Sequence, residues 1–81
     1  MSERLMLRGA LAEKNRRRMD LAAQAEGLIR SLKMHLLPAS AVPLRDIRMH
    51  EVLALAHTLH ETWDQYMTLL REIEDLEREL A

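Results

Sequence analysis

A long hydrophobic heptad repeat occupies the second half of the chain, from Val52 to Leu80. Apolar residues recur there at alternating steps of three and four, and Thr62 is the residue that breaks the apolar run. The a positions are Val52, Leu59, Tyr66, Ile73 and Leu80, and the d positions are Leu55, Thr62, Leu69 and Leu76. A repeat sustained over about four heptads predicts a long α-helix that packs lengthwise against another helix.

The apolar face of this helix is broader than a two-stranded zipper requires. The e positions are also apolar, namely Met49, Ala56, Trp63 and Leu70. The outer f positions are His50, His57, Asp64, Arg71 and Arg78, as solvent exposure demands. Because a two-stranded coiled coil keeps its e positions polar, the broad face predicts a bundle in which the helix has more than one neighbour.

The first half of the chain has a less regular apolar stripe. It consists of Leu7, Leu11, Leu21, Ala25, Leu28, Leu32 and Leu36. Lys14 and Arg18 lie within this stripe. Two interpretations are open at this point. The two basic residues form a polar layer level with Thr62, Gln65 and Tyr66, which fixes the register of the helices. Alternatively, the first helix ends, bends or leaves the bundle there.

Helix breakers are concentrated in the middle of the chain. Two Gly and two Pro are too few for an all-β protein, which needs frequent turns. Both prolines, Pro38 and Pro43, fall in one interruption. We therefore predict a single all-α domain, an antiparallel two-helix hairpin. Its predicted parts are a helix at about 3–36, a loop at about 37–43 and a helix at about 44–80, within one domain over 1–81.

Charge is divided unequally between the two halves of the chain. Residues 1–37 hold eight Lys and Arg against four Asp and Glu, whereas residues 38–81 hold four Arg against nine Asp and Glu. The formal net charge of the whole chain is only −1. Folding the chain back on itself brings the basic and acidic halves together. This favours the antiparallel register, although exposed ion pairs stabilise by only about 0–1 kcal/mol each.

One copy of the chain offers little material for a core. It has 81 residues, its only aromatic residues are Trp63 and Tyr66, and one hairpin covers only part of each apolar face. We therefore predict a homodimer in which two hairpins form a four-helix bundle or coiled coil. Its architecture would resemble that of the small RNA-binding ROP dimer, as an analogy of fold alone. The predicted oligomer interface comprises Val52, Leu55, Leu59, Trp63, Tyr66, Leu69, Ile73 and Leu76.

A basic cluster at 14–18 is the most conspicuous polar feature of the sequence. Its members are Lys14, Arg16, Arg17 and Arg18. Such a cluster can neutralise phosphates, and two-fold symmetry would double its charge. Consecutive helical residues point about 100° apart, however, so these side chains surround the axis instead of forming one strip. A solvated or salt-bridged helical turn is therefore the favoured interpretation, with nucleic-acid contact as the alternative.

The connection between the helices is unusually apolar. Val42, Leu44 and Ile47 lie in or beside it, and loops are normally polar. We predict that these three residues either fold back over the hairpin end or contact a partner protein. The start of the second helix is uncertain, with Ser40 and Asp46 both suited to be its N-cap.

The four His residues do not form a recognisable metal motif. His57 and His60 are spaced for one helix face, with Glu61 and Asp64 one turn further on. The H-E-x-x-H and E-x-x-H patterns are absent, and both His residues occupy outward positions of the heptad. We therefore expect no metal and no cofactor.

Composition excludes several classes of function. The chain has no Cys, no Gly-rich phosphate loop and no nucleophile motif, so we expect that it is not an enzyme. It has no apolar stretch of membrane-spanning length and no signal-peptide pattern, which makes a cytoplasmic protein the expectation. The favoured function is a small structural or adaptor protein that acts through protein–protein interaction and self-association. The alternative is a ROP-like dimer that binds RNA or DNA.

Overall fold

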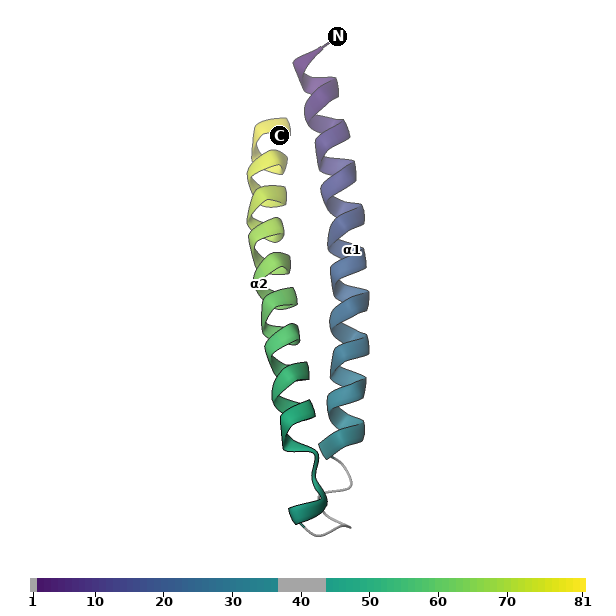
Figure 1. Ribbon diagram of the computed structural model, residues 1–81. Coiled ribbons are helices and arrows are strands. Elements are labelled where there is room, and N and C mark those ends of the chain that lie inside the picture. The colour runs from purple at the N-terminus through teal and green to yellow at the C-terminus, as the bar shows by residue number, and fades with distance from the viewer. Residues whose placement is uncertain (1, 37–43) are drawn as a thin grey trace.

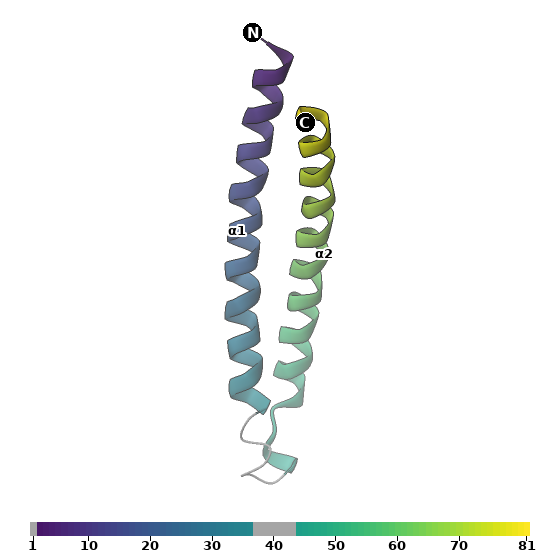
Figure 2. The ribbon, with the colours of Figure 1, turned by 180° about the vertical axis from the view of Figure 1, so that it is seen from behind.

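The computed structural model describes residues 2–36 and 44–81 and consists of two long α-helices that lie side by side. Helix α1 spans Glu3–Leu36 and helix α2 spans Met49–Leu80, with a short 3-10 helix, η2, at Leu44–Asp46. The two helices run antiparallel along almost their whole length (Figures 1 and 2). The predicted all-α hairpin is confirmed, whereas the predicted loop at 37–43 lies outside the described residues.

The heptad repeat forms the seam between the helices, meaning the line of a and d residues along which α1 contacts α2. Val52 and Ile73 are buried on the α2 side of the seam, and Leu21 is the buried residue on the α1 side. Thr62, which interrupts the apolar run, is also buried, and its hydroxyl donates to the Thr58 carbonyl at 2.9 Å. This bond within the helix satisfies the hydroxyl that Thr62 places in the seam.

The seam residues of helix α1 include polar side chains among the apolar ones. Helix α1 is one uninterrupted α-helix, so the interpretation in which it ends near Lys14 and Arg18 is wrong. Both residues are partly buried and continue the alternation of three and four residues. At the far end, a step of three from Leu32 places His35 in the seam, whereas Leu36 is 43% exposed. The last residue of the α1 stripe is therefore His35 and not, as the sequence pattern predicted, Leu36.

Helix α2 begins later than the sequence pattern indicates. Its first residue is Met49, and Arg48 occupies the N-cap position without a side-chain hydrogen bond. Asp46 belongs to η2, where the Ile47 amide donates to the Leu44 carbonyl at 3.2 Å. This turn ends before α2 starts, so Asp46 is not the N-cap. The other candidate, Ser40, lies outside the described residues.

A single hairpin is thin and leaves much of its surface uncovered. The molecule measures 62 × 17 × 14 Å, with a radius of gyration of 18.3 Å. A compact chain of this length has a radius of gyration of about 12 Å. The accessible surface is 6363 Å², against about 5000 Å² for a compact monomer of equal mass. Two helices alone do not enclose a core.

Candidate functional site at the apolar edge

The seam is flanked by two edges of different composition. In an antiparallel helix pair, the e positions of both helices lie along one edge and the g positions lie along the other. The g positions of this hairpin include Arg17, Glu51, Gln65 and Glu72, which define the polar edge. The e positions include Ala22, Ile29, Ala56 and Trp63, which define the apolar edge.

The polar edge is bridged by side chains that reach from one helix to the other. Lys14 extends from the seam and forms an ion pair with Glu72 at 2.9 Å. Arg17 donates to the Gln65 side-chain oxygen at 3.4 Å. Near the opposite end of the hairpin, a His35–Glu51 contact spans the same edge. These contacts join polar side chains of α1 to polar side chains of α2 within one chain.

The apolar edge is not bridged by such contacts and forms a groove between the helices, larger than the hollows of about 340 and 320 Å³ on the polar edge. The groove has a volume of about 590 Å³. It is lined by Ala22, Ala25, Glu26, Ile29, Ala56, Leu59, His60, Trp63 and Tyr66. Trp63 is 52% exposed and Ile29 is 40% exposed. Large apolar side chains left in water on one side of a molecule are typical of a surface that contacts another protein.

The indole ring of Trp63 is held by its neighbours on α2. It stacks on the His60 ring, with 6.1 Å between ring centroids and an interplanar angle of 28°. His60 in turn lies 3.5 Å from the Asp64 carboxylate, one turn further along the helix. The α1 side of the groove beside the aromatic ring is lined by small side chains, Ala22 and Ala25. The site thus combines a large aromatic side chain with adjacent space.

The predicted oligomer-interface residues are divided between the seam and the apolar edge. Seven of them lie buried or half-buried along the seam within one chain: Val52, Leu55, Leu59, Tyr66, Leu69, Ile73 and Leu76. Trp63 is the exposed member of the set. Two of the seven, Leu59 and Tyr66, also line the groove of the apolar edge. The role of the set between two copies of the chain stays a prediction.

The basic cluster does not form one continuous surface. Lys14 and Arg17 bond across the polar edge. Arg18 points into the seam, where its Nε atom is buried without a hydrogen-bond partner in the described part of the chain. Arg16 is exposed on the outer face of α1. The four predicted nucleic-acid contacts therefore have three different environments.

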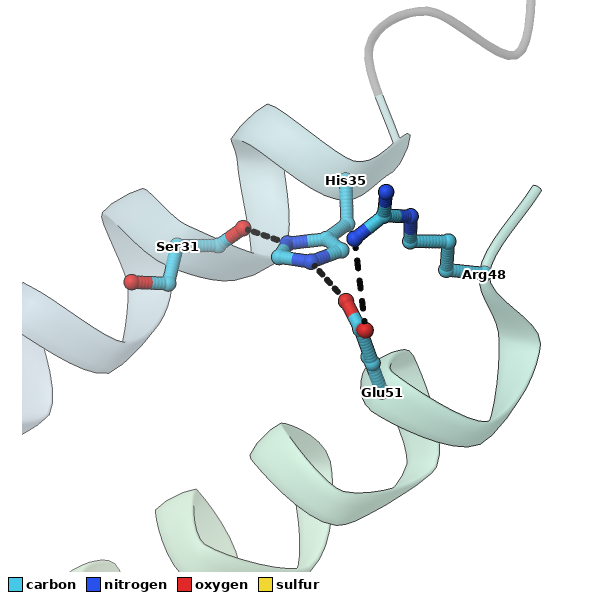
Figure 3. Close-up of polar contacts among 4 residues, drawn as sticks. All are labelled: Ser31, His35, Arg48 and Glu51. Atoms are coloured by element: carbon cyan, nitrogen blue, oxygen red, sulfur yellow. Dashed lines mark hydrogen bonds and ion pairs between the residues drawn. The ribbon is translucent and has the colours of Figure 1, made fainter. Parts of the chain in front are cut away.

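A second polar site, not anticipated from the sequence, joins the end of α1 to the start of α2 (Figure 3). His35 lies with Nδ1 2.8 Å from the Ser31 carbonyl and Nε2 2.8 Å from the Glu51 carboxylate. Arg48 also bonds Glu51, at 3.4 Å. Both ring nitrogens face oxygen acceptors, so the arrangement needs a proton on each nitrogen, which is the imidazolium form.

The protonation of this site follows from its geometry. The Ser31 carbonyl and then the Glu51 side chain raise the pKa of His35 above its ordinary value of 6.5. The His35 hydrogen bond lowers the pKa of Glu51 below its ordinary value of 4.5. A continuation of the Leu28–Leu32 spacing by three residues could have placed His35 in the seam. Its partner Glu51 could not be found without the pairing of the helices.

The remaining predicted sites are only partly described. Leu44 is 79% exposed and Ile47 is half-buried, whereas Val42 lies outside the described residues. His57 lies 3.3 Å from Glu61 on the surface of α2. Within residues 2–36 and 44–81, no three His, Asp or Glu side chains gather as a metal site would require.

Comparison with known protein families, with curated proteins and with solved structures finds no match to this chain. Neither of the described helices has an apolar stretch sufficient to cross a membrane. The functional assignment therefore depends on the chemistry of the hairpin surface.

Proposed function

We propose that this protein is a small, non-enzymatic structural or adaptor protein that acts by helix–helix contact with other proteins and with itself. The observation that carries the proposal is the difference between the two edges. Cross-helix bonds bridge the polar edge, whereas Trp63 and Ile29 stand in solvent along the apolar edge. An exposed aromatic side chain beside a groove is the usual anchor of a protein interface.

Self-association into a four-helix bundle is part of this proposal. The accessible surface exceeds that of a compact monomer by roughly 1300 Å². A stable interface buries about 800 Å² on each partner, so the hairpin has enough surplus area to cover. Covering the apolar edge with two further helices would complete the broad a, d and e face of α2.

Light scattering tests the proposal through the mass of the particle in solution. We expect twice the chain mass of 9.4 kDa at micromolar concentration. Trp63→Glu places a charge in the groove and should return the particle to one chain, because an unpaired charge is costly to bury. Gln65→Glu is the matched control, since it adds the same charge to α2 on the polar edge.

The outcomes separate the parts of the proposal. A dimer lost in Trp63→Glu but kept in Gln65→Glu supports self-association through the apolar edge. A single-chain mass for the unaltered protein would reject self-association. Equal loss in both variants, with circular dichroism unchanged, would reject the apolar edge as the contact surface.

A further inference from the structure

The ion pairs of the polar edge define which residues of α1 and α2 stand at the same level. Lys14 pairs with Glu72 and His35 with Glu51, so every step forward along α1 corresponds to one step back along α2. The same correspondence holds on the apolar edge. There, Ala22 stands within one residue of the level of Trp63, and Ile29 within one residue of the level of Ala56, and all four line the groove. In these two layers, the large side chain of one helix is therefore level with the small side chain of the other.

The b positions, which lie beside the e positions and further from the seam, follow the same level correspondence between α1 and α2. Met19, which is 67% exposed, is level with Met67, and Glu26 is level with His60. These side chains border the apolar edge on its outer side. They are the first that a second pair of helices would meet beyond the groove.

A second hairpin can cover the apolar edge with two-fold symmetry in two ways. If the symmetry axis runs parallel to the helices, each α1 lies on the partner's α2 and residues keep their level. If the axis runs across the helices, α1 lies on the partner's α1 and α2 on the partner's α2. Neighbouring helices are antiparallel in both arrangements, so helix dipoles do not distinguish them.

Charge does distinguish the two arrangements. Helix α1 holds eight basic and four acidic residues, a net charge of +4, whereas α2 holds two basic and eight acidic residues, a net charge of −6. Contact between like helices would place two strongly acidic helices side by side. Contact between unlike helices surrounds each helix with two neighbours of opposite net charge. Such complementarity selects orientation even where each exposed pair is weak.

Side-chain size agrees with the charge. With the axis parallel to the helices, the two Trp63 rings lie diagonally across the bundle, and each is flanked by Ala22 of its own chain and the partner's Ala22. Layers that alternate large and small side chains pack without voids or overlap. The layer of Ile29 and Ala56 repeats the same alternation.

We propose that a second copy of this chain covers the apolar edge with the two-fold axis parallel to the helices, so that each α1 packs antiparallel on the partner's α2. The proposal rests on the self-association described under Proposed function. It places Met19 beside the partner's Met67, and Glu26 beside the partner's His60. The groove of one hairpin becomes part of a shared core.

Disulfide trapping tests this arrangement, because the chain has no Cys of its own. Met19→Cys and Met67→Cys are made as separate variants, mixed under reducing conditions and then oxidised. Any 19–67 disulfide in the mixture joins two chains, since each chain carries one thiol. We expect this mixed disulfide to exceed either symmetric product several-fold. Lys33→Cys with Leu53→Cys repeats the test at another level of the bundle.

The results distinguish this inference from the proposed function. A dimer by light scattering that gives only 67–67 or 19–19 products would overturn the parallel axis and leave self-association intact. A dimer that gives no disulfide with either pair would also overturn it. A single-chain mass would remove the proposed self-association itself, and the arrangement with it.

Discussion

Along the polar edge of the hairpin, Lys14 and Arg17 reach across to α2, whereas along the apolar edge Trp63 and Ile29 face solvent. The two edges flank the same seam and are equally close to it. Polar side chains of one edge bond within the chain. The apolar side chains of the other edge can be buried only against another surface. Polar contacts of this kind select the register of two helices, while burial of apolar area supplies most of the free energy of association.

The difference also explains why so few residues are buried in one chain. Among the described residues, the buried hydrophobic side chains are Leu21, Val52 and Ile73. A hairpin with three such residues has a small core for its length. The apolar edge is therefore the place where further stability is available. The following experiments compare what each edge and the seam contribute to stability and to binding.

The largest effect should come from the seam itself. Ile73 is 4% exposed, and Ile73→Ala should lower the free energy of unfolding by about 2–5 kcal/mol through lost burial and the remaining cavity. Urea denaturation at fixed protein concentration measures this loss. The exposed neighbour in Glu74→Ala should change stability by less than about 0.5 kcal/mol. Equal effects of the two variants would show that Ile73 is not part of a packed core.

Replacement of Arg18 should stabilise the hairpin. The buried Nε of Arg18 has no hydrogen-bond partner in the described part of the chain, and a buried unsatisfied polar group costs about 1–3 kcal/mol. Arg18→Met keeps an unbranched apolar stem that reaches about as far as Nε and removes the guanidinium, so thermal melting should shift upward. Arg16→Met, on the exposed face, serves as the control. A lower melting temperature for Arg18→Met would mean that the guanidinium contributes favourable contacts.

The polar edge should contribute less than the seam. The side chains of Lys14 and Glu72 are 33% and 46% exposed, so solvent screens their ion pair. Lys14→Gln should lower the free energy of unfolding by less than about 1 kcal/mol, and added salt should reduce the difference. Glu72→Gln should have a similar effect, and the double variant should cost less than the sum of the two. Additive losses would contradict a direct pair.

The His35–Glu51 contact should make stability depend on pH. The pKa of His35 is raised in the folded state, so its contribution is complete below the ordinary value of 6.5 and is lost as pH rises through the raised value. Arg48, beside Glu51, opposes protonation of His35 only in part. Melting temperature should therefore fall between about pH 6 and pH 8 more in the native chain than in His35→Gln. His57→Gln should keep the native dependence, and an unchanged slope in His35→Gln would contradict the assignment.

The smallest effect concerns nucleic acid. Because Lys14 and Arg17 bond across the polar edge and Arg18 points into the seam, we expect no binding of mixed-sequence RNA or DNA that weakens steeply with salt. Titration at low and at near-physiological salt measures this. Salt-sensitive binding, lost when Arg16, Arg17 and Arg18 become Gln, would instead support the ROP-like alternative.

The helices and their antiparallel pairing could be predicted from the sequence because both depend on local chemistry. The alternation of three and four residues from Val52 to Leu80 predicts a helix with one apolar face, and the prolines at 38 and 43 predict a break between that helix and the first one. The basic first half and acidic second half then favour folding back. The bounds Glu3–Leu36 agree with the prediction because nothing within that segment breaks a helix.

The two edges are defined only by the pairing of the helices in space. In a sequence, e and g positions look alike beside any a and d stripe, and only the antiparallel contact gathers Ala22 with Trp63 on one side and Arg17 with Gln65 on the other. The same holds for His35 and Glu51, which meet across the end of the hairpin. Periodicity within one helix reports which residues face a neighbour. Which residues share an edge, and which side chain meets which partner, depends on the level at which the second helix lies.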